Sequence, residues 1–224
     1  MKKIFIFALA AVLFSSCAEQ ITRVAQYPKM YEEKPLTIAV MPPINQTNHV
    51  EAKDYFYTTL YGPLCEKGYY VYSPMMTMEM FQAESAYDAE QFIEGDISQF
   101  RNVLGADAAM FTIIKSWKRS NIGGSITAGV EYILRSTKTG DTIYKREGLI
   151  SVDTSVSSGG GGLLGALVDL AATAISTAAT DKIVAGRKCT EFVLQDMPVG
   201  KYSPLFGKDQ KLPAGKAYIK QTVK

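Results

Sequence analysis

The sequence is poor in the side chains that most often carry out chemistry. Its 224 residues include one histidine, His49, and three cysteines. A Ser–His or Cys–His nucleophile would depend on His49, which lies at an expected helix start, where an exposed histidine is the ordinary case. Histidine, cysteine and carboxylate side chains do not occur together at the short spacings of a zinc site. We therefore predict a protein that is not an enzyme and has no catalytic, metal-binding or cofactor-binding residues.

Signals for phosphate binding and for paired carboxylates are also weak. The glycines at 159–162 precede an expected helix but lack the lysine and serine of a P-loop, so they indicate a hinge. Acidic side chains gather between Glu79 and Glu94, and such helix faces are usually solvated. A glycosidase-like pair of catalytic carboxylates in this segment remains an alternative, which makes an envelope hydrolase the second alternative function.

No charge-free apolar stretch reaches the roughly 20 residues that span a bilayer. The chain begins instead with Lys2, Lys3, an apolar run at 4–14, Ser15, Ser16 and Cys17. This order is typical of a secretory signal peptide, so residues 1–16 are predicted to be removed. Residues 14–17 resemble a bacterial lipobox, with Phe14 where leucine is usual. Cys17 is therefore predicted to be the lipid attachment site, and an ordinary signal with an incidental cysteine is the alternative.

Lipid on Cys17 would keep the protein in the membrane, because more than one acyl chain, palmitate among them, makes anchoring stable. The residue after the cysteine is Ala18. In some bacteria an acidic residue at this position keeps a lipoprotein in the inner membrane, so Ala18 resembles an outer-membrane sorting signal. We expect a lipid-anchored protein of the outer membrane, with its domain in the periplasm.

Charge is balanced along the chain except near its C-terminus. The 24 basic residues include Lys2 and Lys3, so without residues 1–16 basic and acidic side chains balance at 22 each, which gives no reason to expect nucleic acid as a partner. From Met197 onward there are six lysines, one acid and three prolines. This tail is predicted to be extended, either as a solvated arm or against anionic lipid or an acidic partner.

Cys65 and Cys189 would enter an oxidising compartment after export. Their spacing does not match a metal site, and the sequence leaves two alternatives open. They form a disulfide, or they remain as two buried free thiols.

Apolar periodicity and turn residues predict a mixed succession of helices and strands. Strands are expected at 36–41, 69–73, 107–117, 126–136 and 142–153. Helices are expected at 50–67, 74–84, 88–104 and 163–194, with a kink or break near Gly62 and breaks near Gly95 and Gly186. This order predicts an α/β protein with a single domain, in which a mixed β-sheet packs against helices.

The domain is expected at 35–196, between a lipid-anchored tether at 17–34 and the basic tail at 197–224.

Two elements of this domain also allow a more specific functional interpretation. The alternating strands at 126–153 would suit a hairpin contributed to a membrane pore, although Lys138, Lys145 and Arg146 favour an ordinary sheet. The small residues of the last helix would suit a subunit interface, although core packing is the default.

Several stretches together resemble the bacterial GNA-type lipoprotein family, catalogued as domain of unknown function 799. They occur in order at 38–45, 47–48, 55–57, 63–64, 67–71, 105–108 and 131–136. The resemblance implies an α/β domain similar to the TolB N-terminal domain and to CsgG-like periplasmic domains. It also implies an envelope complex with a CsgG-like partner, and it carries no catalytic residue.

The resulting hypothesis is a membrane-anchored, non-enzymatic accessory that binds an envelope protein and assists a secretion or surface-structure complex. The first alternative is a self-assembling pore or scaffold subunit, which would be a homo-oligomer. The envelope hydrolase is the second.

Overall fold

The computed structural model describes residues 20–83, 89–120, 125–153 and 174–223. In chain order the elements are α2 (Arg23–Gln26), α3 (Pro28–Glu33), β1 (Thr37–Val40), β2 (Ile44–Asn45), α4 (Ala52–Glu66), β3 (Tyr70–Val71), α5 (Pro74–Ala83), α6 (Glu90–Ile93), α7 (Ser98–Leu104), β4 (Ala108–Arg119), β5 (Ser125–Ser136), β6 (Thr142–Asp153), α9 (Ala174–Val193) and β7 (Tyr218–Val223).

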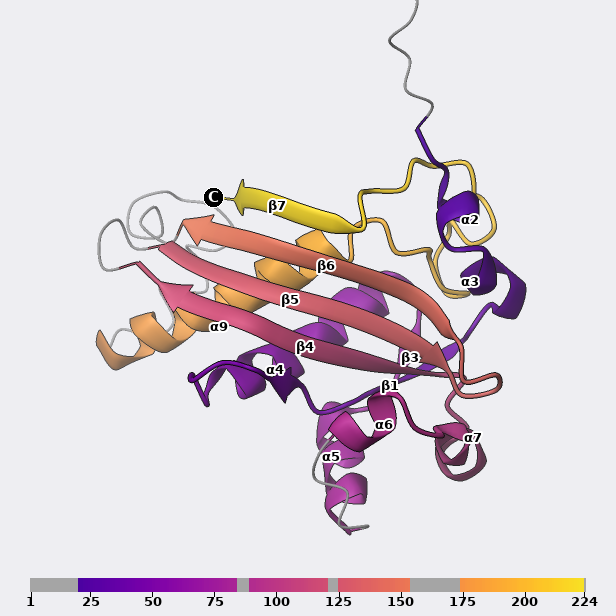
Figure 1. Cartoon of the computed structure of the whole chain (residues 1–224), viewed down its shortest axis with the longest axis horizontal. Coiled ribbons are helices and arrows are strands. Elements are labelled where there is room, and N and C mark those ends of the chain that lie inside the picture. The colour runs from indigo at the N-terminus through magenta and orange to yellow at the C-terminus, as the bar shows by residue number, and fades with distance from the viewer. Residues whose placement is uncertain (1–19, 84–88, 121–124, 154–173, 224) are drawn as a thin grey trace, which may run out of the picture.

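The strands form one mixed sheet of seven in the order β3-β1-β4-β5-β6-β7, with β2 beside β4 (Figure 1). β1 runs parallel to β3 and β4, whereas β4, β5 and β6 are successive antiparallel neighbours. β7 then returns parallel to β6, which requires the long crossover through α9. The predicted mixed α/β fold is therefore confirmed.

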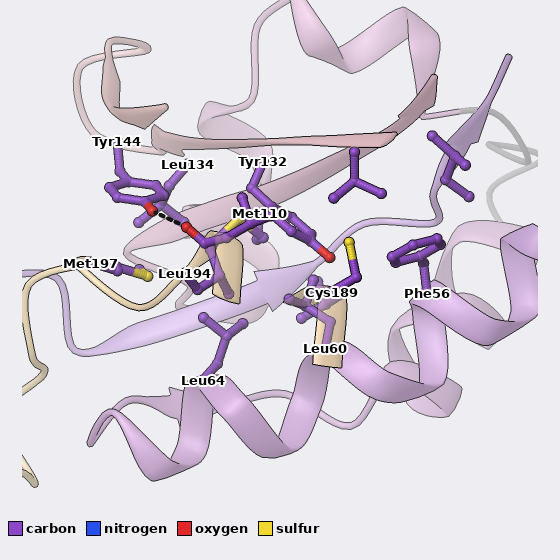
Figure 2. Close-up of a cluster of buried hydrophobic side chains, with 14 of the residues drawn as sticks. Phe56, Leu60, Leu64, Met110, Tyr132, Leu134, Tyr144, Cys189, Leu194 and Met197 are labelled. Atoms are coloured by element: carbon purple, nitrogen blue, oxygen red, sulfur yellow. Dashed lines mark hydrogen bonds between the residues drawn. The ribbon is translucent and has the colours of Figure 1, made fainter. Parts of the chain in front are cut away.

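Helices cover both faces of this sheet, and each face has its own core. Helices α4 and α9 pack on one face, where the buried residues include Phe56, Leu60, Tyr132 and Cys189 (Figure 2). On the other face, α5, α6 and α7 bury Phe81 and Phe100 against the β1–β4 part of the sheet. Burial on both faces explains the unbroken apolar sequence of β4 near Ala108.

The central strands follow the sequence prediction closely. β5 and β6 form the expected hairpin, and Gly140 at its turn has φ 76°, a conformation that glycine adopts without strain. The break near Gly95 is also present, between α6 and α7. The break predicted near Gly186 is wrong, because α9 continues through it, and α4 continues through Gly62 without a break. The expected start of the last helix lies outside the described residues.

Both ends of the described chain differ from expectation. The segment predicted as a polar tether contains α2 and α3, with Tyr27 and Met30 buried. The C-terminal segment, predicted as an extended arm, forms a series of turns and then the edge strand β7. The reason is that these two segments pack on each other and on the sheet, so each provides partners that neither has alone.

Candidate interaction surfaces

Residues 20–26 and 197–217 meet at one corner of the molecule, which we call the terminal corner (Figure 1). The backbone N–H of Arg23 donates to Leu212 O at 2.8 Å, and that of Ala214 donates to Ile21 O at 2.8 Å. Thr22 and Pro213 form an antiparallel bridge between the segments. The N-terminal segment is thereby fixed to the C-terminal one before the first strand begins.

A buried ion pair holds this corner to the sheet. Arg146 on β6 donates from Nη1 to Asp196 Oδ1 at 2.5 Å, and the two side chains are 1% and 3% exposed. The second oxygen of Asp196 accepts from the Tyr27 hydroxyl at 2.8 Å and from Gly215 N–H at 2.7 Å. One carboxylate therefore joins β6, the end of α9 and both terminal segments.

Close packing around the pair requires a glycine at 215. A Cβ there would lie 2.0 Å from Arg146 Nη2. Burial raises the pKa of Tyr27 far above its ordinary value, and the Asp196 charge adds to that shift. This cluster is a structural lock, since its polar groups pair with one another inside the protein.

A second buried carboxylate, Asp209, organises the C-terminal turns. Its Oδ2 accepts from Val199 N–H at 2.9 Å and lies 3.6 Å from Arg23 Nη1. Beside it, between α3 and the C-terminal segment, is a cleft of about 70 Å³ lined by Tyr31 and Phe206 among others. Ligand pockets usually measure roughly 300–1,000 Å³, so this cleft is too small for one.

The exposed side chains of the terminal corner include both apolar and basic ones. The exposed apolar residues there are Ile21, Val24, Tyr202, Leu205, Phe206 and Leu212. Lys201, Lys208 and Lys211 are exposed beside them, whereas Asp209 is only 1% exposed. The corner therefore presents a surface that is both apolar and positively charged.

A different exposed apolar surface lies on α5. Met75, Met76 and Met80 are 69%, 61% and 38% exposed. Met76 and Met80 are one helical turn apart and so share a face. The helix Pro74–Ala83 contains no basic residue. We call Met75, Met76 and Met80 the methionine patch, and α5 lies well away from the terminal corner in Figure 1.

Among the residues considered for chemistry, those that the structure describes lie at the surface. His49 is exposed before α4, and Glu79, Glu90 and Glu94 are exposed as well. Across the described ranges, no group of three or more His, Cys, Asp or Glu side chains could hold a metal ion. None of the described helices is long and apolar enough to cross a membrane. Cys17 lies outside the described residues.

In the structure Cys65 and Cys189 are free thiols. Cys65 on α4 is half-buried, while Cys189 on α9 is fully buried with its Sγ 3.9 Å from Ala128 O. Burial raises the pKa of the Cys189 thiol far above its ordinary range.

The hairpin that could have served a pore is an internal part of the sheet. Its inner face packs on α9, and its outer face carries ion pairs. Lys115 Nζ lies 2.9 Å from Glu131 Oε2, and Lys145 Nζ lies 2.7 Å from Glu131 Oε1. Burial raises the pKa of Glu131, but the hydrogen bonds from both lysines outweigh it and hold that pKa below its ordinary value. A surface of this kind suits water better than lipid.

Residues 25–200, well over half of the chain, match the family described as "Putative lipoprotein GNA1162-like". The chain belongs to this lipoprotein family. Membership confirms the resemblance seen in the sequence and implies a lipid-anchored location in the cell envelope. The family description assigns no enzymatic activity.

Individual proteins are also similar to this chain. "Putative lipoprotein NMB1124/NMB1162" of Neisseria meningitidis is 27% identical over 183 residues, covering 80% of this chain and 84% of the relative. The crystal structure of lipoprotein GNA1162 from Neisseria meningitidis has a TM-score of 0.50 at 22% identity, covering 65% of this chain and 99% of that one. Hypothetical protein CT253 of Chlamydia trachomatis gives a TM-score of 0.46 at 14% identity over 71% of this chain and 94% of that one. The likeness to GNA1162 shows a shared fold.

Two of the residues that carried the resemblance, Arg135 and Asp107, hold neighbouring elements in place in this fold. Arg135 donates to the carbonyls of Phe92, Ile93 and Gly95 and so fixes α6 beside the sheet. The Asp107 carboxylate accepts from the N–H groups of Leu36 and Thr37 at the start of β1.

Sequence reasoning missed the Arg146–Asp196 lock and the terminal corner. A signal for the lock was available, since Arg146 interrupts the inward-facing residues of an alternating strand. Its partner lies 50 residues away, and spacing alone does not reveal such a pair.

Proposed function

We propose that the chain is a lipoprotein whose signal peptide, residues 1–16, is removed and whose Cys17 carries the acyl chains, at the outer membrane with the domain in the periplasm. Its folded domain then serves as a non-enzymatic accessory that binds an envelope protein. A CsgG-like component of a secretion or surface-structure complex is the partner that the family resemblance favours.

The observation that supports a binding role most directly is the methionine patch. Large exposed apolar side chains grouped on one helix face are typical of protein interaction sites. Methionine is common at such sites, because its flexible thioether adapts to the partner surface. The exposed positions of His49 and Glu79 count against the hydrolase, since active sites usually lie in concave pockets.

A photo-crosslinking amino acid at Met76, introduced into the full chain in its native host, tests this function. We expect a discrete crosslinked product with an envelope protein, and no such product from Val50, an 84% exposed control position outside the methionine patch. A double Met76→Asp and Met80→Asp variant should fail to restore a deletion strain. Normal secretion and surface structures in that strain, together with no crosslink at Met76, would lead us to withdraw the proposal.

A further inference from the structure

We infer that the terminal corner is a membrane-docking surface, which lies in the headgroup region of the phospholipid leaflet that holds the acyl chains. This inference rests on the proposed lipid attachment at Cys17. It adds that the folded domain itself contacts the bilayer, in one orientation.

The first argument is the reach of the chain. Gln20 is the first described residue and follows Cys17 by three positions. An extended chain spans at most about 3.6 Å per residue, so roughly 11 Å separates Cys17 from Gln20 at most. The headgroup layer on each side of a bilayer is about 5–8 Å thick. A corner tied to an acylated residue over so short a distance lies at the headgroups.

The second argument is that the N-terminal segment of the described chain is packed into the fold, so it does not lengthen the link between Cys17 and the domain. The backbone N–H groups of Arg23 and Ala214 donate to Leu212 O and Ile21 O across the corner, so the N-terminal segment is part of the fold from its first helix. The lock between Arg146 and Asp196 fixes that fold to the sheet. The anchor therefore restrains the orientation of the whole domain.

The third argument is the chemistry of the surface. Leu205 is 52% exposed and Phe206 37% exposed, in a turn flanked by Lys201 and Lys208. Apolar side chains that enter the interface beside lysines that reach anionic phosphates are the combination that binds bilayer surfaces. The only acid between 197 and 217, Asp209, is buried, so the exposed charge of that segment is positive.

The methionine patch provides the contrast. It is apolar as well, but α5 has no basic residue and stands apart from the terminal corner (Figure 1). With the terminal corner at the bilayer, the methionine patch is left clear of it and free for a protein partner.

Tryptophan fluorescence in full-length, lipidated protein tests the docking surface. The single native tryptophan, Trp117, is 5% exposed and gives a constant background. Phe206→Trp and Leu205→Trp would place a probe at the corner, and Val103→Trp, at a 72% exposed position on α7, is the matched control. Each variant is inserted into phosphatidylethanolamine–phosphatidylglycerol vesicles with or without bromine on the lipid chains.

We expect bromine to reduce the added fluorescence of both corner probes by roughly half, because interfacial side chains reach about 5–10 Å into the headgroup boundary. The Val103→Trp probe should be unaffected. Equal quenching at all three positions, or none at the corner in protein that floats with the vesicles, would overturn the docking surface and leave the lipid anchor standing. Protein whose mass shows no acyl chain on Cys17 would overturn the anchor, and the docking surface with it.

Discussion

At the scale of single residues, the protein depends on the buried ion pair between Arg146 and Asp196. Asp196 accepts hydrogen bonds from Tyr27, Arg146 and Gly215, so each of its oxygens has partners. A buried charge that loses its partner is strongly destabilising, because desolvation is no longer offset.

Asp196→Asn should therefore lower the free energy of unfolding by about 3–5 kcal/mol, since it leaves the Arg146 charge buried without a counterion. The measurement is urea denaturation followed by circular dichroism. Glu66→Gln is the matched control, because the Arg187–Glu66 pair is 54% and 63% exposed and should contribute little. Equal losses from both variants would contradict the role of the lock.

Gly215→Ala should also destabilise the protein, by about 1–3 kcal/mol, because overpacking displaces neighbouring side chains. Here the added methyl group would meet the Arg146 guanidinium. Gly62→Ala is the control, since a Cβ there meets nothing within 4 Å on helix α4. Thermal unfolding of the two variants side by side measures the difference, and an unchanged midpoint for Gly215→Ala would show that the corner is loosely packed.

The two cysteines give a prediction at the same scale. Cys189 should resist alkylation in the native protein, since it is buried and its raised pKa keeps the thiol protonated. Mass spectrometry after alkylation, with and without reductant, should find it unmodified until urea is added. A mass lower by about two hydrogens before reduction would instead establish the disulfide with Cys65.

At the scale of elements, the crossover from α9 to β7 completes the sheet. β7 pairs with β6 from Glu147–Tyr218 to Val152–Val223, and Val223 is buried. Without it, half of the long strand β6 would become an open sheet edge, and open edges favour aggregation.

Deletion of residues 214–224 should therefore give a protein that unfolds at lower temperature and forms aggregates in size-exclusion chromatography. It removes β7 together with Gly215 of the lock. A Lys220→Ala variant keeps the strand and changes only an exposed side chain, so it should behave as the native protein does. A deletion variant with native stability would support the solvated arm predicted from composition.

At the scale of the whole molecule, the core between the sheet and helices α4 and α9 buries several tyrosine hydroxyls in neutral form. Burial raises the pKa of Tyr27, Tyr69, Tyr132 and Tyr144 well above the ordinary value near 10. In the unfolded chain these hydroxyls ionise above pH about 10, and in the folded protein they do not. The stability that they contribute is thus complete below that pH and is lost above it.

We therefore expect the free energy of unfolding to fall steeply above pH about 10. Lys67 acts in the opposite direction over a narrower range, because burial lowers its pKa from 10.5 to about 8 and stability gains as the pH rises between those values. Urea denaturation at pH 7, 9 and 11, with tyrosine absorbance at 295 nm, would measure both. Ionisation of all 13 tyrosines near pH 10 in still-folded protein would contradict the buried state of these four.

Local pattern alone determined much of this protein. The alternation of β5 and β6 with a glycine turn and the apolar run of β4 are local signals. So are the glycines with positive φ at 68 and 105, which follow the ends of α4 and α7. They act through neighbours within a few residues, so they can be read along the chain. The family motifs and the scarcity of histidine were likewise evident from the sequence without the structure.

The tertiary structure decided what happens at the two ends. The segments at 20–34 and 197–223 look like polar linkers because their apolar and basic residues follow no period. They fold because they meet each other and the Arg146–Asp196 lock, at sequence separations of 50 residues or more. Contacts of that kind depend on where the sheet brings distant segments together, and that placement is a property of the whole fold.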